Sequence, residues 1–138
     1  MRHTHILRRG TTALAAAALL GFGAAPAHAD PGIPTVGYGY QNWGSSVRCI
    51  QYYVNQLTDV HILEDGKFGP ETALGIRRIQ QLASTDWAAA PLKVDGYFGQ
   101  ATGQVVLERV KYHPWMVDDY QKASICGHYV PSYTVVLN

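Results

Sequence analysis

The sequence contains few charges, and neither sign dominates. Lys and Arg number 11, Asp and Glu number 10, and together they make up 15% of the chain. Without the first 29 residues, which contain three of the arginines, eight basic residues face ten acidic ones, a net charge of about −2. Binding to phosphates requires a basic surface. The composition therefore argues against nucleic acid as a ligand and disfavours electrostatic binding to other acidic polymers.

Long apolar runs are also missing beyond the start of the chain. Three arginines precede an Ala/Leu-rich run at 11–25, and Ala-His-Ala follows just before Asp30. This order is typical of a secretory signal peptide, so we expect residues 1–29 to be removed. Arg8-Arg9 hints at twin-arginine export, but the residues that should follow the pair are absent. The sequence predicts an exported protein with no membrane span, which is either released from the cell or held non-covalently outside it.

Only two cysteines occur, Cys49 and Cys126, and both lie in the part expected to be exported. A lone pair outside the cell most simply forms one disulfide. It would close a loop on the order of eighty residues, which stabilises by roughly 4 kcal/mol in the chain-entropy description. The competing interpretation is a catalytic cysteine. It is the weaker one, because Cys49 falls in the middle of an expected helix and has a second cysteine to pair with.

Metal-binding signatures are absent. After residue 29 only His61, His113 and His128 remain, and no H-x-H, H-x-D or H-E-x-x-H occurs. His113, Asp118 and His128 would converge only if the end of the chain folds back. A calcium loop of the EF-hand type needs alternating oxygen ligands, and Leu63 and Lys67 interrupt that pattern. We therefore expect no metal and no cofactor.

The carboxylates needed by a glycosidase are equally scarce, since Glu64, Glu71 and Glu108 are the only glutamates. Such an enzyme needs two carboxylates flanking its substrate. Glu71 falls in the first turn of an expected helix, where it complements the dipole, and Glu108 lies among cationic neighbours on another. No G-x-S-x-G elbow occurs, although the sequence leaves a Ser-His-Asp triad of another kind open. We expect a protein that is not an enzyme.

What the sequence does contain is a repeat. The octapeptide D-G-K-F-G-P-E-T at 65–72 recurs thirty positions later as D-G-Y-F-G-Q-A-T at 95–102. A repeat of this kind indicates one local structural motif that occurs twice. Asp-Gly is a turn pair, in which Asp bonds the backbone two residues on and Gly takes a positive φ. We expect Phe to enter a core, the second Gly to allow a close backbone approach, and Thr to fall in the first turn of a helix. The residues expected to shape the turns are Asp65, Gly66, Phe68 and Gly69, and Asp95, Gly96, Phe98 and Gly99.

The hydrophobic spacing predicts a helix before the first turn. Its apolar residues follow one another at steps of three or four, as on a core-facing stripe. We expect Ser45 or Ser46 to cap this helix. Cys49 and Tyr53 lie on a flank, where a segment laid over the helix could reach the cysteine. The stripe consists of Val47, Ile50, Val54 and Leu57.

Two further helices follow the two turns. One should begin at Pro70, whose ring favours a first helical turn, and end near Ser84. The other should cover residues 100–110. His113-Pro114 then breaks the pattern, because the residue before proline avoids helical angles. Residues 129–137 are β-branched and aromatic, which predicts an extended segment.

This arrangement resembles the small three-helix peptidoglycan-binding domain of bacterial cell-wall proteins. In that family a Gly-containing turn leads into a helix of the form V-x-x-L-Q-x-x-L-N, which Gly44–Gln51 and Asn55–Leu57 match loosely. The D-G-x-F-G-P-x-T turn follows, and 65–72 matches it fully. The hydrophobic-Gln pair that ends the next family helix corresponds to Ile79-Gln80, and the second turn corresponds to 95–102. Four motifs thus occur in the family's order and spacing.

The resemblance covers about residues 43–110 and implies a fold and a function. We expect an all-α protein in which a three-helix bundle at 43–110 follows a Gly/Pro/Tyr-rich extended leader at 30–42. A C-terminal tail at 111–138 would be stapled to the bundle by the disulfide. The implied function is non-catalytic binding of peptidoglycan, glycan or stem peptide, by a secreted protein that is either released or held on the cell wall. Two alternatives stay open: the same fold binding an exported partner enzyme, and a small wall hydrolase with an unrecognised site.

Aromatic residues supply the candidate binding side chains. The chain has nine tyrosines and three tryptophans, all beyond residue 29. Sugar rings present apolar faces that stack on aromatic planes, and tyrosine hydroxyls can bond the amides of stem peptides. Tyr97 in the second turn and Trp87 in the preceding loop are the first candidates, with Tyr40 and Trp43 before the first helix. The competing interpretation is packing of the leader and tail against the bundle, which we favour for Tyr53 and the region 129–133.

Overall fold

The computed structural model describes residues 32–87, 89–133 and 137. The predicted signal peptide, residues 1–29, lies outside these described residues, as do the first two residues of the predicted leader. The helical elements are α1 (Ser45–Leu57), α2 (Pro70–Thr85), α3 (Gln100–Tyr112), the short 3-10 helix η1 (Pro114–Met116) and α4 (Tyr120–Gly127). The described residues contain isolated β-bridges but no strand. The prediction of an all-α fold is confirmed.

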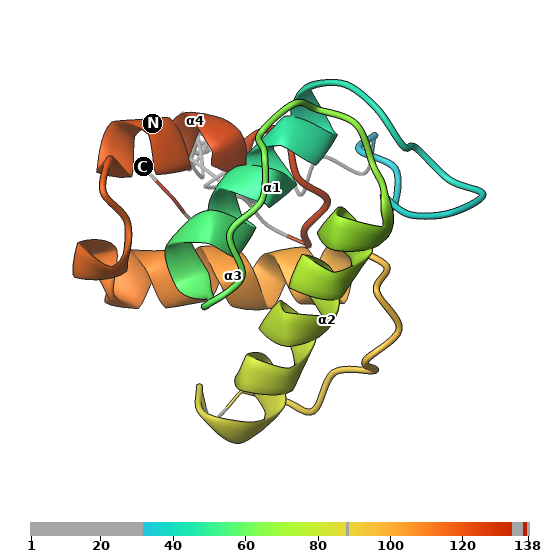
Figure 1. The fold of residues 1–138 in the computed structure, drawn as a ribbon. Helices are drawn as coiled ribbons and strands as arrows, with labels where there is room; N and C mark the ends of the chain where they lie inside the picture. The colour runs from blue at the N-terminus through green and yellow to red at the C-terminus, as the bar shows by residue number, and fades with distance from the viewer. Residues whose placement is uncertain (1–31, 88, 134–136, 138) are drawn as a thin grey trace, which may run out of the picture.

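Helix α1 is the centre of the bundle, and it packs against α2 on one side and α4 on another (Figure 1). The predicted apolar stripe is confirmed, because Val47, Ile50 and Val54 are fully buried and Leu57 is nearly so. Gly75 of α2 lets the two helices approach closely, since a Cβ at that position would collide with the Val54 side chain. The core therefore forms where α1 and α2 cross, and α3 closes it with Val106, Leu107 and Val110.

The prediction of a serine cap on α1 is wrong. The helix begins at Ser45, so the capping position falls to Gly44, and no side chain bonds the free N–H groups there. Gly44 has a φ of 98° and its N–H donates to the carbonyl of Gly66 at 2.8 Å. The start of α1 is thus fixed by a backbone bond to the first turn rather than by Ser45 or Ser46. Helix α2 begins at Pro70, as predicted.

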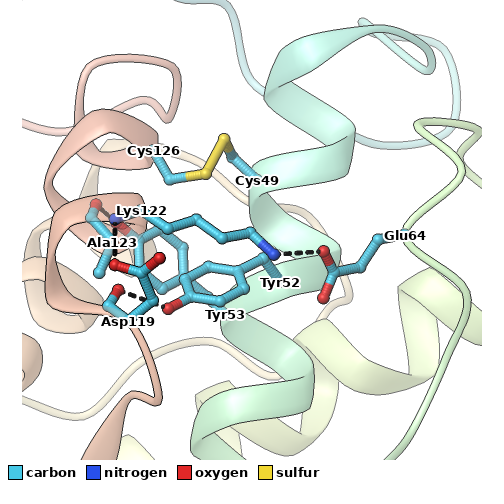
Figure 2. Close-up of a disulfide and its surroundings, with 8 residues drawn as sticks. All are labelled: Cys49, Tyr52, Tyr53, Glu64, Asp119, Lys122, Ala123 and Cys126. Atoms are coloured by element: carbon cyan, nitrogen blue, oxygen red, sulfur yellow. Dashed lines mark hydrogen bonds and ion pairs between the residues drawn. A yellow bond between two sulfur atoms is a disulfide. The ribbon is translucent and has the colours of Figure 1, made fainter.

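The C-terminal tail contains a helix that the sequence analysis did not predict. Helix α4 is eight residues long and is capped by Asp119, whose side chain accepts from the N–H of Lys122 at 2.9 Å. Its buried side is made of small residues, Ala123, Cys126 and Gly127, so it lacks the large apolar stripe that reveals a helix in sequence. The predicted disulfide between Cys49 and Cys126 is present and ties α4 to α1 (Figure 2).

Two tyrosines on the same flank of α1 reinforce this attachment. The Tyr53 hydroxyl donates to the carbonyl of Ala123 at 2.6 Å, and the Tyr52 hydroxyl donates to the carbonyl of Asp119 at 2.9 Å (Figure 2). The ammonium of Lys122 lies 4.2 Å from the centre of the Tyr52 ring. Both rings are fully buried, so the packing role expected of Tyr53 is confirmed. The spacing Cys49, Tyr52, Tyr53 makes a second stripe on α1 that binds the tail.

We predict that replacing both cysteines, Cys49→Ser with Cys126→Ser, lowers the free energy of unfolding by about 4 kcal/mol. The physical reason is that the bridge closes a loop of 77 residues and restricts the unfolded chain. Urea unfolding followed by circular dichroism measures the change. A loss below about 1 kcal/mol would show that the tail is held by its tyrosine contacts alone.

We further predict that the free energy of unfolding falls as the pH rises above about 10. Burial raises the pKa of Tyr53, and burial together with the Asp118 carboxylate raises that of Tyr52. The folded hydroxyls thus stay protonated where the unfolded chain ionises, at a pKa near 10, so stability is intact below that pH and is lost above it. In Tyr53→Phe the free energy of unfolding should fall less steeply at alkaline pH, which urea unfolding at increasing pH measures. Replacing the exposed Tyr112 by Phe is the control, and equal slopes in the two variants would contradict this assignment.

Candidate functional site

Each of the two repeated turns is held by a buried glutamine from the preceding helix. Gln51 of α1 is 2% exposed, and its Oε1 accepts from the N–H of Gly66 at 2.8 Å. Its Nε2 donates to Asp65 Oδ1 and to the carbonyl of Lys67, both at 3.0 Å. The same amide also lies 3.2 Å from the hydroxyl of Thr72, in the first turn of α2. One side chain therefore fixes the turn and the start of the next helix.

Gln80 of α2 repeats this arrangement at the second turn. Its Oε1 accepts from the N–H groups of Asp95 and Gly96, both at 3.0 Å. Its Nε2 donates to Asp95 Oδ1 and to the carbonyl of Tyr97, again at 3.0 Å, and to Thr102 at 3.3 Å. The structural repeat is therefore longer than the octapeptide and includes the Ile-Gln pair at 50–51 and 79–80.

The turns themselves have the geometry that their sequence predicts. Gly66 and Gly96 have φ angles of 73° and 79°, in the left-handed region that glycine adopts without strain. Asp65 Oδ1 accepts from the N–H of Lys67 at 2.9 Å, and Asp95 Oδ1 accepts from that of Tyr97 at 3.0 Å. The Lys67 N–H, followed by the Gln51 amide, lowers the pKa of the Asp65 carboxyl. These bonds hold each Asp in place as a backbone acceptor.

The second glycine of each turn does not serve the close approach that we expected. A Cβ at Gly69 would meet no atom within 4 Å, and one at Gly99 would meet only the Thr35 hydroxyl, at 3.6 Å. Both glycines are instead the extended residues that precede α2 and α3. The phenylalanines also differ from each other, since Phe98 is fully buried in the core, whereas Phe68 is half-buried at its edge.

The leader joins the two turns rather than running freely before the bundle. Val36 and Phe98 exchange two backbone bonds, of 3.1 and 2.9 Å. At the other turn the N–H of Phe68 donates to the carbonyl of Asn42 at 2.8 Å. The leader thus lies on the side of the bundle where α2 and α3 begin (Figure 1), and it bridges elements that are thirty residues apart in the chain.

A cleft opens beside each turn. The first-turn cleft has a volume of about 370 Å³, and the second-turn cleft has a volume of about 470 Å³. Their walls are built from equivalent positions of the repeat, because each includes the buried Gln, the turn Asp and the helix-start Thr. Residues that line the first-turn cleft include Gln51, Ile62, Asp65, Lys67, Phe68, Glu71 and Thr72, and those of the second-turn cleft include Gln80, Leu92, Lys93, Asp95, Tyr97, Thr102 and Tyr133.

The structure brings two of the four predicted binding residues together. Tyr97 lines the second-turn cleft, and its ring centre lies 5.6 Å from that of Tyr40 in an edge-to-face contact. Gly37 makes room for the Tyr97 ring, because a Cβ there would collide with it. Trp43 is 74% exposed and pairs through its backbone with Lys67 of the first turn.

Trp87 lies apart from the other three candidates. It lines a separate cleft of about 180 Å³, together with residues of α3 such as Arg109. The Arg109 guanidinium lies 5.4 Å from the centre of the Trp87 ring, and the indole also packs against the core. Trp87 therefore does not share the cleft of Tyr97, although both belong to the loop region before α3.

Two further aromatic residues belong to this surface and were not among the predicted binding residues. Tyr38 is 53% exposed, and its ring centre lies 5.0 Å from that of Phe68. The Tyr38-Gly39-Tyr40 spacing was the available signal, because it places two tyrosines on one short loop. Tyr133 lines the second-turn cleft, and no local signal could have placed it there, since the path of the tail depends on the disulfide.

No group of three or more His, Cys, Asp or Glu side chains that could hold a metal occurs among the residues that the structure describes. The alternative set His113, Asp118 and His128 is not brought together. The His113 ring bonds Arg109, and the Asp118 carboxylate accepts from the Tyr52 hydroxyl at 3.2 Å. Within the same described part of the chain, no helix is long and apolar enough to cross a membrane.

Comparison with known proteins identified no relative: no family model, no curated protein and no solved structure matches the chain. The fold and the site define a disulfide-stapled helical bundle with two glutamine-held turns and an aromatic leader between them. The resemblance to peptidoglycan-binding domains therefore rests on the order of the sequence motifs.

We predict that Gln80→Ala lowers the free energy of unfolding by about 3 kcal/mol, because it leaves buried and partly buried backbone groups of the second turn without a partner. Gln81→Ala is the matched control. Gln81 is its exposed neighbour on α2, and its replacement should change stability by less than about 0.5 kcal/mol. Urea unfolding of both variants makes the comparison. Equal effects would show that the buried amide does not hold the turn.

Proposed function

We propose that this chain is a non-catalytic module that binds bacterial peptidoglycan, with Tyr97 and the second-turn cleft at the centre of the site. The observation that carries the proposal is the duplicated D-G-x-F-G turn, each copy held by a buried glutamine and each bordered by a cleft. The order and spacing of these turns are those of the peptidoglycan-binding family that the sequence resembles.

The chemistry of the second-turn cleft suits a saccharide. Tyr97 and the 54% exposed Tyr133 supply aromatic surface for the apolar face of a sugar ring. Lys93 and Asp95 supply polar groups at the same cleft, which can fix the orientation of hydroxyl and acetamido groups. Both signs of charge are present, so the cleft favours a ligand rich in neutral polar groups over a strongly charged one.

A second candidate function is binding of an exported partner protein, such as a wall enzyme. The supporting observation is a separate pair of exposed aromatics where α3 ends, Tyr112 and Trp115, which are 67% and 75% exposed. Exposed aromatic side chains are enriched at protein interfaces. Export itself rests on the predicted signal peptide and belongs to the same proposal.

We predict that protein expressed from the full sequence sediments with purified peptidoglycan, and that Tyr97→Ala weakens this binding about tenfold, a loss of about 1.4 kcal/mol. Tyr97→Phe should retain most of the binding, because it keeps the ring and its contact with Tyr40. Trp87→Ala should have little effect, because Trp87 lines a different cleft.

Circular dichroism confirms folding of each variant before the comparison. Sedimentation that is insensitive to Tyr97 but lost in Trp87→Ala would move the site to the other cleft. If the parent protein does not sediment, the peptidoglycan proposal fails, and the exported partner becomes the better candidate. Release of soluble fragments from the peptidoglycan would contradict a non-catalytic role.

A further inference from the structure

The leader places one tyrosine ring against an aromatic residue of each cleft. At one end the Tyr38 ring packs edge-on against Phe68, which lines the first-turn cleft. At the other end the Tyr40 ring packs edge-on against Tyr97, which lines the second-turn cleft. Only Gly39 separates the two leader tyrosines, and both are more than half exposed. The leader loop therefore contributes one exposed ring beside each cleft.

The leader is anchored at both ends, so this arrangement is fixed before any ligand arrives. Val36 pairs with Phe98 of the second turn, and the carbonyl of Asn42 accepts from Phe68 of the first turn. Between these anchors the N–H of Gly37 donates to the carbonyl of Gln41 at 3.1 Å, which closes the loop that carries both tyrosines. A surface that is ordered in advance loses less entropy on binding.

The two ends of this surface share a backbone frame but differ in side chains. Lys67 of the first turn occupies the place of Tyr97 in the second, and Glu71 occupies the place of Ala101. The first-turn cleft is thus more charged and the second-turn cleft more aromatic. Such a pair suits different units of one ligand better than two copies of the same small molecule.

We propose that the two clefts and the leader tyrosines between them form one elongated face that binds several consecutive sugar units of a single glycan strand. This inference rests on the proposed function and specifies the part of peptidoglycan that is recognised. A strand of several sugar units could contact both clefts and the two leader tyrosines at once, so the inference specifies a strand rather than a single disaccharide. Stacking of successive sugar rings on Tyr38 and Tyr40 would link the units held in the clefts.

The test is calorimetric titration of the full chain with peptidoglycan glycan strands from which the stem peptides have been removed. The strands are separated into a disaccharide fraction and a fraction several disaccharides long. We expect the long strands to bind at least tenfold more tightly per strand than the disaccharide. Tyr38→Ala should reduce this advantage several-fold, whereas Tyr38→Phe should preserve it, because the phenyl ring keeps the stacking surface and the contact with Phe68.

Tyr129→Ala serves as the control, since Tyr129 is exposed but lines neither cleft. An advantage of long strands that is unchanged in Tyr38→Ala would reflect only the larger number of binding positions on a long strand, and it would overturn the inference. Equal affinity for both fractions would overturn it as well. Binding to intact peptidoglycan without binding to stripped strands would overturn the elongated glycan face and leave the proposed function standing. Absence of binding to both would remove both proposals.

Discussion

The buried amides of Gln51 and Gln80 are the constraint on which the rest of the structure depends. A polar group buried without partners is costly, and an amide offers both an acceptor and donors. Each glutamine meets this requirement only if the following chain returns as a tight turn with its N–H and carbonyl groups directed at the amide. That return places the start of α2 over α1 and the start of α3 over α2. The clefts and the anchoring points of the leader follow from the same two turns.

Different faces of helix α1 contact different parts of the chain. Its main apolar stripe packs into the core, and Gln51 holds the first turn. The tail binds to the flank that carries Cys49, Tyr52 and Tyr53. A bundle of this size buries a limited core, so the covalent and hydrogen-bonded attachment of α4 adds stability. The disulfide end of the tail is held on this flank (Figure 2), and the chain then returns to the start of α3, where Tyr133 lines the second-turn cleft.

Features set by neighbouring residues could be predicted from the sequence, whereas most features set by distant residues could not. The stripe of α1, the start of α2 at Pro70 and the positive φ of Gly66 depend on neighbouring residues, and the sequence predicted them. The disulfide followed from the scarcity of cysteine. The serine cap failed because Gly44 is held by a distant residue, Gly66. Helix α4 was missed because small residues form its buried side. The separation of Trp87 from Tyr97 could not be predicted from neighbouring residues either, because the packing of α3 determines where each end of the loop lies. The glutamine partners were visible as a recurring Ile-Gln pair, but only the fold shows what the amides bind.

The repeat also explains how one frame can carry two different clefts. At the variable position of D-G-x-F-G, the turn uses only the backbone: the N–H donates to the Asp carboxylate, and the carbonyl accepts from the glutamine amide. The side chain at this position therefore contributes nothing to the hydrogen bonds that hold the turn. Lysine at position 67 and tyrosine at position 97 occupy the same backbone setting, and both line a cleft. Since the two turns keep the same hydrogen bonds with different side chains at this position, the chemistry of each cleft can differ without a change in the turn.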